Sequence, residues 1–245
     1  MTLPTRHALI TGASIRIGRA ITQGLAQNGW NLTLHYNTSQ KEAQALAHEL
    51  QHSFGVQTKT IQADLNDEKQ VARFLNDKNE SAMSPVTAIV HAACLFERDE
   101  KDPDGSRHQR VNFLAPQILD RAFAAQCPND AKGSILYFLD NTPMPDFLSH
   151  YSLSKTSIRE MIAPRALELA PSLRLNALAL GPILKNQRES DEHFQKLILR
   201  TPLRHKNPVD DVVKAAFFLL DNTSITGQIL NVDSGMHLLG KDITV

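Results

Sequence analysis

The sequence has few cysteines, no excess of charge of either sign and no long apolar run. Lysine and arginine together number 26, as do aspartate and glutamate, so no basic surface for nucleic acid or anionic membrane is indicated. The two cysteines, Cys94 and Cys127, lack the spacing of metal ligands and do not indicate a disulfide framework. No stretch approaches about 18 consecutive apolar residues, and no basic segment leads into a long apolar one. We expect a soluble, cytoplasmic protein that binds no metal, nucleic acid or membrane.

Short apolar segments alternate with amphipathic ones along the whole chain. Hydrophobic residues make up 42% of the 245 residues, enough for a sizeable core. The apolar segments predict strands, at 7–11, 31–36, 58–62, 88–91, 133–139, 173–180 and 228–232. The amphipathic segments predict helices, at 17–28, 41–51, 71–75, 110–126, 151–170 and 210–220. Because no repeat or linker interrupts this order, we expect one domain over 1–245, a doubly wound (Rossmann) parallel sheet of about seven strands with helices on both faces.

A glycine-containing turn joins the first predicted strand to the first helix. Gly12 would let the chain turn tightly, and Gly18 would let the helix approach the sheet. Free N–H groups where the helix begins, near Ile17, would face a pyrophosphate. The turn lacks the G-x-G-x-x-G spacing, so its weight comes from its place between a strand and an amphipathic helix. It predicts a dinucleotide site.

The end of the second predicted strand indicates which dinucleotide is bound. An NAD site would place a carboxylate there to bind the ribose 2′-hydroxyl, but none occurs before Glu42. Arg16 lies in the glycine turn, near the expected place of the adenosine ribose. A cation with hydrogen-bond donors suits a 2′-phosphate, so NADP is favoured over NAD; taken alone, Arg16 can equally be a solvated surface charge. The residues that supply these donors are His35, Tyr36, Asn37 and Ser39.

Other positions would line the same nucleotide. Asp64 and Leu65 follow the third strand, beside the expected adenine, although Asp64 can equally be a helix N-cap. Small residues from Ala92 onward follow the fourth strand and would let backbone pass close to the cofactor. Gly181 begins a turn after the sixth strand. The charged residues 97–108 are expected to form a mobile loop, and the polar residues 185–200 a flap over the site.

Tyr151 and Lys155 are spaced i and i+4 on a predicted helix, which places both on one face. A neighbouring ammonium favours the phenolate, so we expect the pKa of Tyr151 to fall from about 10 toward neutrality. Such a tyrosine could exchange a proton near neutral pH, as the reduction of a carbonyl or imine requires. The spacing alone is common by chance, so the dinucleotide unit upstream carries the argument. Asn112, in the helix over 110–126, could belong to a catalytic relay or simply bond backbone or water.

These motifs in their order resemble the short-chain dehydrogenase/reductase family across nearly the whole chain. The matching residues are Thr11-Gly12 with Gly18, Asp64-Leu65, Asn112, Tyr151 with Lys155, Gly181-Pro182 and Thr226-Gly227. The resemblance implies that Tyr151 donates a proton and that Lys155 lowers its pKa and holds the nicotinamide ribose. It further implies that Asn112 positions a water in the proton relay. Homotetramers are common in that family, so a homotetramer is expected here.

Departures from the common family pattern look like pteridine reductases and dihydromonapterin reductases. Asp140 ends the fifth strand where most members have a serine, and Arg16 replaces a glycine. The resemblance implies that a pterin stacks between nicotinamide and the ring of Phe96. Asp140, with its pKa raised by burial beside Tyr151, would protonate or hold a ring nitrogen while hydride reaches the adjacent carbon. Plain core packing for Phe96 and a turn or N-cap role for Asp140 remain the alternatives.

Three features depart from that subgroup. The eleven-residue step from Asp140 to Tyr151 is shorter than usual, so Asn141 or Thr142 could face the substrate instead. The usual Asn-Asn-Ala after the fourth strand is His91-Ala92-Ala93, and a basic residue of some pteridine reductases falls on Thr38. We expect an NADPH-dependent reductase that converts a dihydropterin, or a dihydrofolate, to its tetrahydro form. The alternatives are a ketone reductase acting on 3-oxoacyl thioesters and a scaffold that senses NADPH without turnover.

Overall fold

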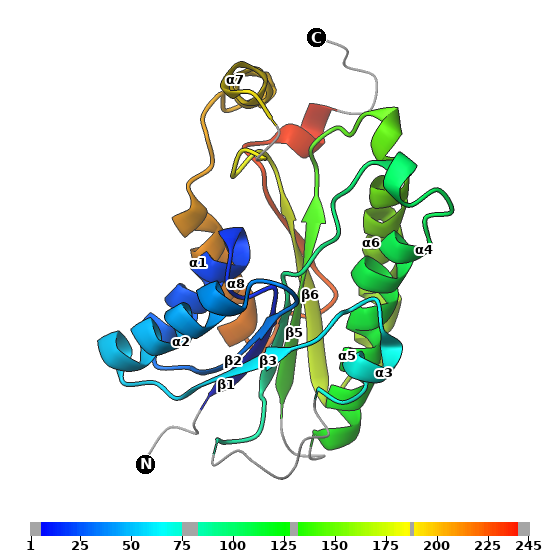
Figure 1. The fold of residues 1–245 in the computed structure, drawn as a ribbon. Coiled ribbons are helices and arrows are strands. Elements are labelled where there is room, and N and C mark those ends of the chain that lie inside the picture. The colour runs from blue at the N-terminus through cyan, green and yellow to red at the C-terminus, as the bar shows by residue number, and fades with distance from the viewer. Residues whose placement is uncertain (1–5, 75–82, 128–131, 187–188, 240–245) are drawn as a thin grey trace.

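A parallel sheet organises the computed structural model, which describes residues 6–74, 83–127, 132–186 and 189–239. The seven strands run in the order β3-β2-β1-β4-β5-β6-β7, and every neighbouring pair is parallel (Figure 1). Their bounds are β1 His7–Thr11, β2 Asn31–Tyr36, β3 Thr58–Gln62, β4 Ala88–His91, β5 Gly133–Asp140, β6 Leu173–Leu180 and β7 Ile229–Val232. The doubly wound sheet predicted from the sequence is confirmed, with β5 one residue longer and β7 one residue shorter than expected.

Helices cover both faces of the sheet. In Figure 1, α1, α2 and α8 lie on one side and α3 to α6 on the other. The helices are α1 Arg16–Gln27, α2 Gln40–Phe54, α3 Glu68–Val71, α4 Ser106–His108, α5 Ala115–Gln126, α6 Ser149–Leu169, α7 Asp191–Arg200 and α8 Val209–Asp221. Short 3₁₀ turns are η1 Asp99–Lys101, η3 Asp146–Leu148 and η4 Met236–Leu239, and η2 Gln109–Leu114 is a π-helix. None of the helices in the described ranges is long and apolar enough to cross a lipid bilayer.

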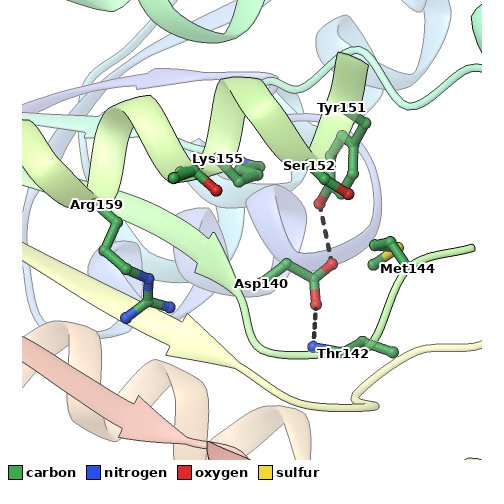
Figure 2. Close-up of a pocket in the computed structure, with 8 residues that line it drawn as sticks. Asp140, Thr142, Met144, Tyr151, Ser152, Lys155 and Arg159 are labelled. Carbon is green, nitrogen blue, oxygen red and sulfur yellow. Dashed lines mark hydrogen bonds between the residues drawn. The ribbon is translucent and has the colours of Figure 1, made fainter. Parts of the chain in front are cut away.

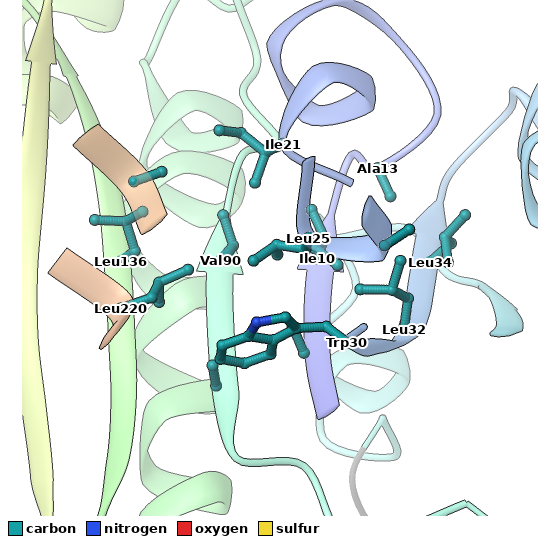
Figure 3. Close-up of a cluster of buried hydrophobic side chains, with 14 of the residues drawn as sticks. Ile10, Ala13, Ile21, Leu25, Trp30, Leu32, Leu34, Val90, Leu136 and Leu220 are labelled. Carbon is teal, nitrogen blue, oxygen red and sulfur yellow. The ribbon is translucent and has the colours of Figure 1, made fainter. Parts of the chain in front are cut away.

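Two hydrophobic clusters, one on each face, explain why the strands look uniformly apolar in the sequence. Ile10 packs with Ile21, Leu25 and Trp30 under α1 and α8 (Figure 3). Its neighbour Leu9 points to the opposite cluster, beneath α5 and α6. Side chains alternate between faces along a strand, so a strand covered on both sides needs apolar residues at consecutive positions.

The glycine turn between β1 and α1 has the close contacts that require glycine. Gly12 has a φ of +62°, and a Cβ there would lie 2.8 Å from the Ala93 Cα. A Cβ at Gly18 would lie 2.1 Å from the Gly12 carbonyl oxygen. Arg16 adopts a φ of +51°, a left-handed conformation that favours glycine. Backbone strain is therefore stored in this turn, at the start of α1.

Residues 97–108, expected to be a mobile loop, instead contain the 3₁₀ turn η1 and the helix α4 and are bonded internally. Asp102 accepts hydrogen bonds from the backbone N–H of Arg107 and of His108, at 3.1 and 2.9 Å. Its carboxylate also lies 2.7 Å from Nδ1 of His108, and both side chains are buried. The expectation failed because charge-rich composition does not distinguish solvated carboxylates from capping ones.

The expected flap over 185–200 contains α7, a helix that the sequence analysis did not foresee. Ser190 caps α7, since its Oγ accepts a hydrogen bond from the His193 N–H at 3.1 Å. Phe194 and Ile198 on its inner face are buried. Its polar residues face outward; because most of residues 185–196 are polar, the amphipathic pattern of α7 was overlooked.

Candidate active site

A pocket of about 170 Å³ lies where β5 ends beside the first turns of α6. Figure 2 shows Asp140 between the Tyr151 hydroxyl and the Thr142 backbone. The residues that line the pocket are Asp140, Thr142, Met144, Tyr151, Ser152, Lys155, Thr156 and Arg159. The structure thus brings together three of the residues predicted to be catalytic, from a strand end and a helix.

Asp140 is the residue that faces the tyrosine. The Tyr151 hydroxyl donates to Oδ2 of Asp140 at 2.9 Å, and the Thr142 N–H donates to Oδ1 at 2.8 Å. Asn141 turns away, because its side chain bonds Asp233 at 2.8 Å and Arg159 at 2.7 Å. The shorter step to Tyr151 therefore leaves Asp140 in register with the tyrosine, and Asn141 does not replace it.

The two acids of this pair both hold their protons more tightly than usual. Burial raises the pKa of Asp140, and this outweighs the hydrogen bonds from Thr142 and Tyr151 and the charge of Lys155, which lower it. Burial also raises the pKa of Tyr151 well above its ordinary value, and the carboxylate of Asp140 raises it further. The raised pKa of Asp140 agrees with the prediction. The lowered pKa predicted for Tyr151 is wrong, since burial and a neighbouring carboxylate both oppose the phenolate.

Lys155 lies one turn beyond Tyr151 on α6, as the spacing predicted. Its Nζ donates to the Phe138 carbonyl oxygen at 2.9 Å and lies 5.7 Å from the centroid of the Tyr151 ring. The ammonium is thus directed at the backbone of β5, which explains why it does not dominate the titration of the tyrosine. It ties α6 to the strand that carries Asp140.

Phe96 forms the aromatic side of the site. Its ring meets that of Tyr151 edge-to-face, with centroids 4.7 Å apart and planes at 90°. Because Phe96 remains 40% exposed, the alternative of plain core packing does not apply. An aromatic face beside a proton-donating pair can flank a flat heterocycle.

Asn112 is buried and braces this aromatic segment. Its Oδ1 accepts from the Leu95 N–H at 2.7 Å, and its Nδ2 donates to the Leu95 carbonyl and to Ser154 Oγ, both at 3.0 Å. It lies in the π-helix η2, a rare conformation that is frequent at functional sites. The backbone-bonding alternative is what the structure contains, and the water-positioning role implied by the family stays a prediction.

His35, predicted to face the 2′-phosphate, is buried, and both of its ring nitrogens are bonded to backbone groups. The Gly12 N–H donates to its Nδ1 at 3.2 Å, and its Nε2 lies 3.0 Å from the Ala63 carbonyl oxygen. Burial lowers its pKa to about 4, so the ring is neutral. His35 therefore holds the glycine turn against β3. The prediction failed because β2 is buried on both faces, which a short apolar run does not reveal.

Arg16 reaches away from the place predicted for it. Its guanidinium donates two hydrogen bonds of 3.0 Å, to the carbonyl oxygens of Leu184 and Lys185. The side chain therefore connects the turn after β1 to the segment after β6, with β4 and β5 between them in the sheet. In doubly wound sheets this crevice outside the strand ends is the ligand-binding place. The adenosine end, after β2, is left to other side chains.

At the end of β2, exposed polar groups remain available. Asn37 is exposed, and Ser39 Oγ lies 2.7 Å from Ser14 Oγ, a hydroxyl that the sequence analysis missed. Tyr36 is buried and is part of the core. No acidic residue directly follows β2. Ser14 and Ser39 are distant in the chain, so only the fold shows that they lie side by side.

The remaining predicted cofactor residues are placed as follows. Asp64 accepts from the Asn66 N–H at 2.9 Å, and the N-cap of α3 is Asp67, so the N-cap alternative for Asp64 is wrong. Leu65 is buried in the core beneath α5. A Cβ at Gly181 would lie 2.8 Å from the Asp233 Cα, so glycine is required there for packing.

His91, the last residue of β4, belongs to a buried polar network. His91 Nε2 lies 2.8 Å from Asp120 Oδ1, and the Tyr137 hydroxyl donates to the other carboxylate oxygen at 2.5 Å. All three side chains are buried beneath the site. The network joins β4, β5 and α5. Among the described residues, no group of three histidine, cysteine or acidic side chains is arranged to hold a metal ion.

Known proteins that resemble the chain are oxidoreductases. An uncharacterized oxidoreductase of Bacillus subtilis is 31% identical over 95% of the chain and 99% of its own length. A dihydromonapterin reductase of an Enterobacter species is 24% identical over 96% of the chain and 98% of its own length. A 3-oxoacyl-[acyl-carrier-protein] reductase of Staphylococcus aureus is 26% identical over 96% and 99%.

Structural similarity extends over the same length. The crystal structure of FolM alternative dihydrofolate reductase 1 from Brucella canis, complexed with NADP, has a TM-score of 0.89 and 30% identity. The similarity covers 98% of this chain and 97% of that one. Residues 12–237 match the family model described as enoyl-(acyl carrier protein) reductase. The chain therefore belongs to the short-chain dehydrogenase/reductase family.

Proposed function

We propose that the protein is an NADPH-dependent reductase that converts a dihydropterin, or the related dihydrofolate, to its tetrahydro form. The observation that carries the proposal is the half-buried carboxyl group of Asp140, which lies 2.9 Å from the Tyr151 hydroxyl where a ketone reductase would use a serine. Similarity to a dihydromonapterin reductase and to a FolM dihydrofolate reductase supports the same substrate class.

The crevice suits a phosphorylated dinucleotide. Helix α1 has no side-chain cap and no acidic residue in its first turn, so its first N–H groups are free for a pyrophosphate. Gly12 lets the turn that precedes α1 pack directly on the backbone of Ala93, where a Cβ would lie 2.8 Å from the Ala93 Cα. Asn37 and Ser39 follow β2 without a carboxylate, which favours a 2′-phosphate over a free ribose hydroxyl. NADPH would supply the hydride.

Reduction of a C=N bond places hydride on carbon and requires a proton on nitrogen. Asp140 is suited to supply that proton, because its raised pKa keeps a larger share of the carboxyl group neutral than an exposed aspartate would. Once the proton has left, the Tyr151 hydroxyl and the Thr142 N–H can stabilise the carboxylate with their hydrogen bonds. Phe96 would flank the flat pterin ring, and Lys155 would hold the catalytic helix against β5.

A ketone reductase acting on 3-oxoacyl thioesters is the competing function, and similarity to the Staphylococcus aureus reductase favours it. In that reaction negative charge develops on the ketone oxygen, which an ionised Asp140 would repel. A scaffold that binds NADPH without turnover is the third candidate; the Asp140–Tyr151 pair argues against it, because a scaffold has no need of such an acid.

The proposal is tested by NADPH oxidation with the purified protein. Dihydromonapterin or dihydrobiopterin, dihydrofolate and a 3-oxoacyl thioester are offered in parallel, each with NADPH and with NADH. We expect turnover of the dihydropterin with NADPH, lost in Asp140→Ser. Turnover of the thioester alone would replace the proposal by the ketone reductase. NADPH binding without any turnover would favour the scaffold.

A further inference from the structure

The helix that carries Tyr151 is capped by a carboxylate from a distant part of the chain. Leu148, at the N-cap position of α6, offers no side-chain acceptor to the free N–H groups of the first turn. Asp99 provides it from 50 residues upstream. The N–H groups of Ser149 and His150 donate to its two oxygens at 3.0 and 3.1 Å, and Ser149 Oγ donates at 2.6 Å. The next residue is Tyr151.

The segment around Asp99 also carries the aromatic side of the site. Phe96, three residues earlier, makes the edge-to-face contact with Tyr151. The Arg98 guanidinium lies 4.6 Å from the centroid of the Phe147 ring, just before α6 begins. Asn112 fixes the start of the segment through its two bonds to Leu95. Phe96, Arg98 and Asp99 thus contact the N-terminal end of α6 or the residues just before it.

Charge favours this cap at neutral pH. Desolvation raises the pKa of Asp99, but the hydrogen bonds from Ser149 and His150 outweigh it and leave the pKa below its usual value. The carboxylate is therefore ionised. A negative charge beside the N-terminus of a helix is stabilised by the aligned peptide dipoles.

We infer that Asp99 is a positioning residue, which fixes the first turn of α6 and so holds Tyr151 between Phe96 and Asp140. The inference rests on the proposed reductase function only where the rate of reduction is the readout. A displacement of about 1 Å at a reacting group can lower turnover by about a hundredfold. The long helix itself is held by its packing on β5 and β6, so loss of the cap alters its first turn and not the fold.

Two substitutions of Asp99 separate its roles. Asp99→Ala removes every acceptor, whereas Asp99→Asn keeps an oxygen that caps a helix about as well as aspartate does. We expect kcat to fall about tenfold to a hundredfold in Asp99→Ala, with the KM for NADPH little changed. We expect Asp99→Asn to recover most of the rate. If Asp99 only stabilised the fold, both variants would give less folded protein. The kcat of the folded protein would then not fall while the KM for NADPH stays unchanged.

Asp67→Ala is the matched control. Asp67 caps α3 as Asp99 caps α6, by accepting from the N–H groups of Lys69 and Gln70 at 2.9 and 3.3 Å. It lies outside the pocket, so the same chemical change should leave kcat unaltered. Equal loss of kcat in Asp67→Ala and Asp99→Ala would overturn the inference, since capping as such would then explain the effect.

A readout without substrate keeps the inference apart from the proposed function. The chain has three tyrosines, so carbon-13 spectra of labelled tyrosine can resolve Tyr151, assigned with Tyr151→Phe. The Phe96 ring should shift the Tyr151 signal in the wild type, in Asp99→Asn and in Asp67→Ala, and the shift should collapse in Asp99→Ala. An unchanged shift in Asp99→Ala overturns the inference whatever substrate the protein accepts. A collapsed shift in a protein that reduces no pterin overturns only the proposed function.

Discussion

Replacing Asp140 by asparagine should lower activity and should remove the loss of stability that the wild type shows as the pH rises. Burial raises the pKa of Asp140 in the folded state above its value in the unfolded chain. Between those two values the folded state binds more protons than the unfolded state, so stability falls as the pH rises through this window. Asparagine has no charge to bury and does not show this loss. Asp140→Asn should therefore gain on the wild type as the pH rises.

The size of the effect follows from the two hydrogen bonds of the carboxylate. An asparagine oxygen can keep the 2.8 Å bond from Thr142 or the 2.9 Å bond from Tyr151, at a cost of about 1 kcal/mol for the one that is lost. Each pH unit within the window is worth up to about 1.4 kcal/mol to the asparagine variant. We expect the variant to be less stable than the wild type by about 1 kcal/mol at low pH, and to gain on it as the carboxyl group ionises.

The assay is urea unfolding of the two proteins at several pH values. The midpoints of the two transitions report the difference in stability where both proteins show the same dependence of the free energy of unfolding on urea concentration. Asp67→Asn serves as the control of opposite sign. Its partners Gln70 and Lys69 lower the pKa of Asp67, so its variant should lose stability at neutral pH and regain parity in acid. A constant difference between Asp140→Asn and the wild type across the pH range would refute the reasoning. The rate of dihydropterin reduction should fall in Asp140→Asn at every pH.

Three further outcomes are expected. Tyr151→Phe should lower turnover by about tenfold to a hundredfold, because the Asp140 carboxylate loses its hydrogen bond from the tyrosine, while NADPH binding, measured by fluorescence titration, is retained; unchanged turnover would show that this bond does not assist the reaction. Arg16→Gly should leave the melting temperature unchanged, because glycine suits the φ of +51° and this offsets the two lost bonds to carbonyl groups; a lower melting temperature would contradict this. We propose a homotetramer in which exposed leucines of α6 are covered by neighbouring subunits. The Leu167 side chain is 80% exposed, so Leu167→Glu should yield smaller particles in sedimentation. A monomeric wild type would exclude that assembly.

The fold could be predicted from the sequence because its signals are local. Strands covered on both faces are apolar at consecutive positions, and the turn at Gly12 and Gly18 needs glycine for contacts that are now visible. The spacing of Tyr151 and Lys155 predicted their shared helix for the same reason. Periodicity reports on such features since it depends on residues a few positions apart.

The wrong predictions concern contacts between segments that are distant in the chain. No local pattern shows that the Gly12 N–H would bond His35, or that Arg16 would bond carbonyl groups of Leu184 and Lys185. Charged residues near 99 suggested a mobile loop, yet Asp99 bonds to a helix start 50 residues away. Composition cannot distinguish a carboxylate in solvent from one at a helix N-terminus.

The raised pKa of Tyr151 bears on which group delivers the proton. The sequence suggested a lysine-activated tyrosine, but Lys155 is engaged with the Phe138 carbonyl and Tyr151 holds its proton firmly. Of the two coupled acids, Asp140 is the stronger one, since even a raised carboxyl pKa lies below that of a phenol raised in the same site. In the proposed reaction the carboxyl group would be the first to release a proton to a ring nitrogen, and the Tyr151 hydroxyl, already directed at Oδ2, would stabilise the carboxylate that forms. A nitrogen base accepts a proton from a carboxylic acid far more readily than a ketone oxygen does, which is why this pair suits an imine.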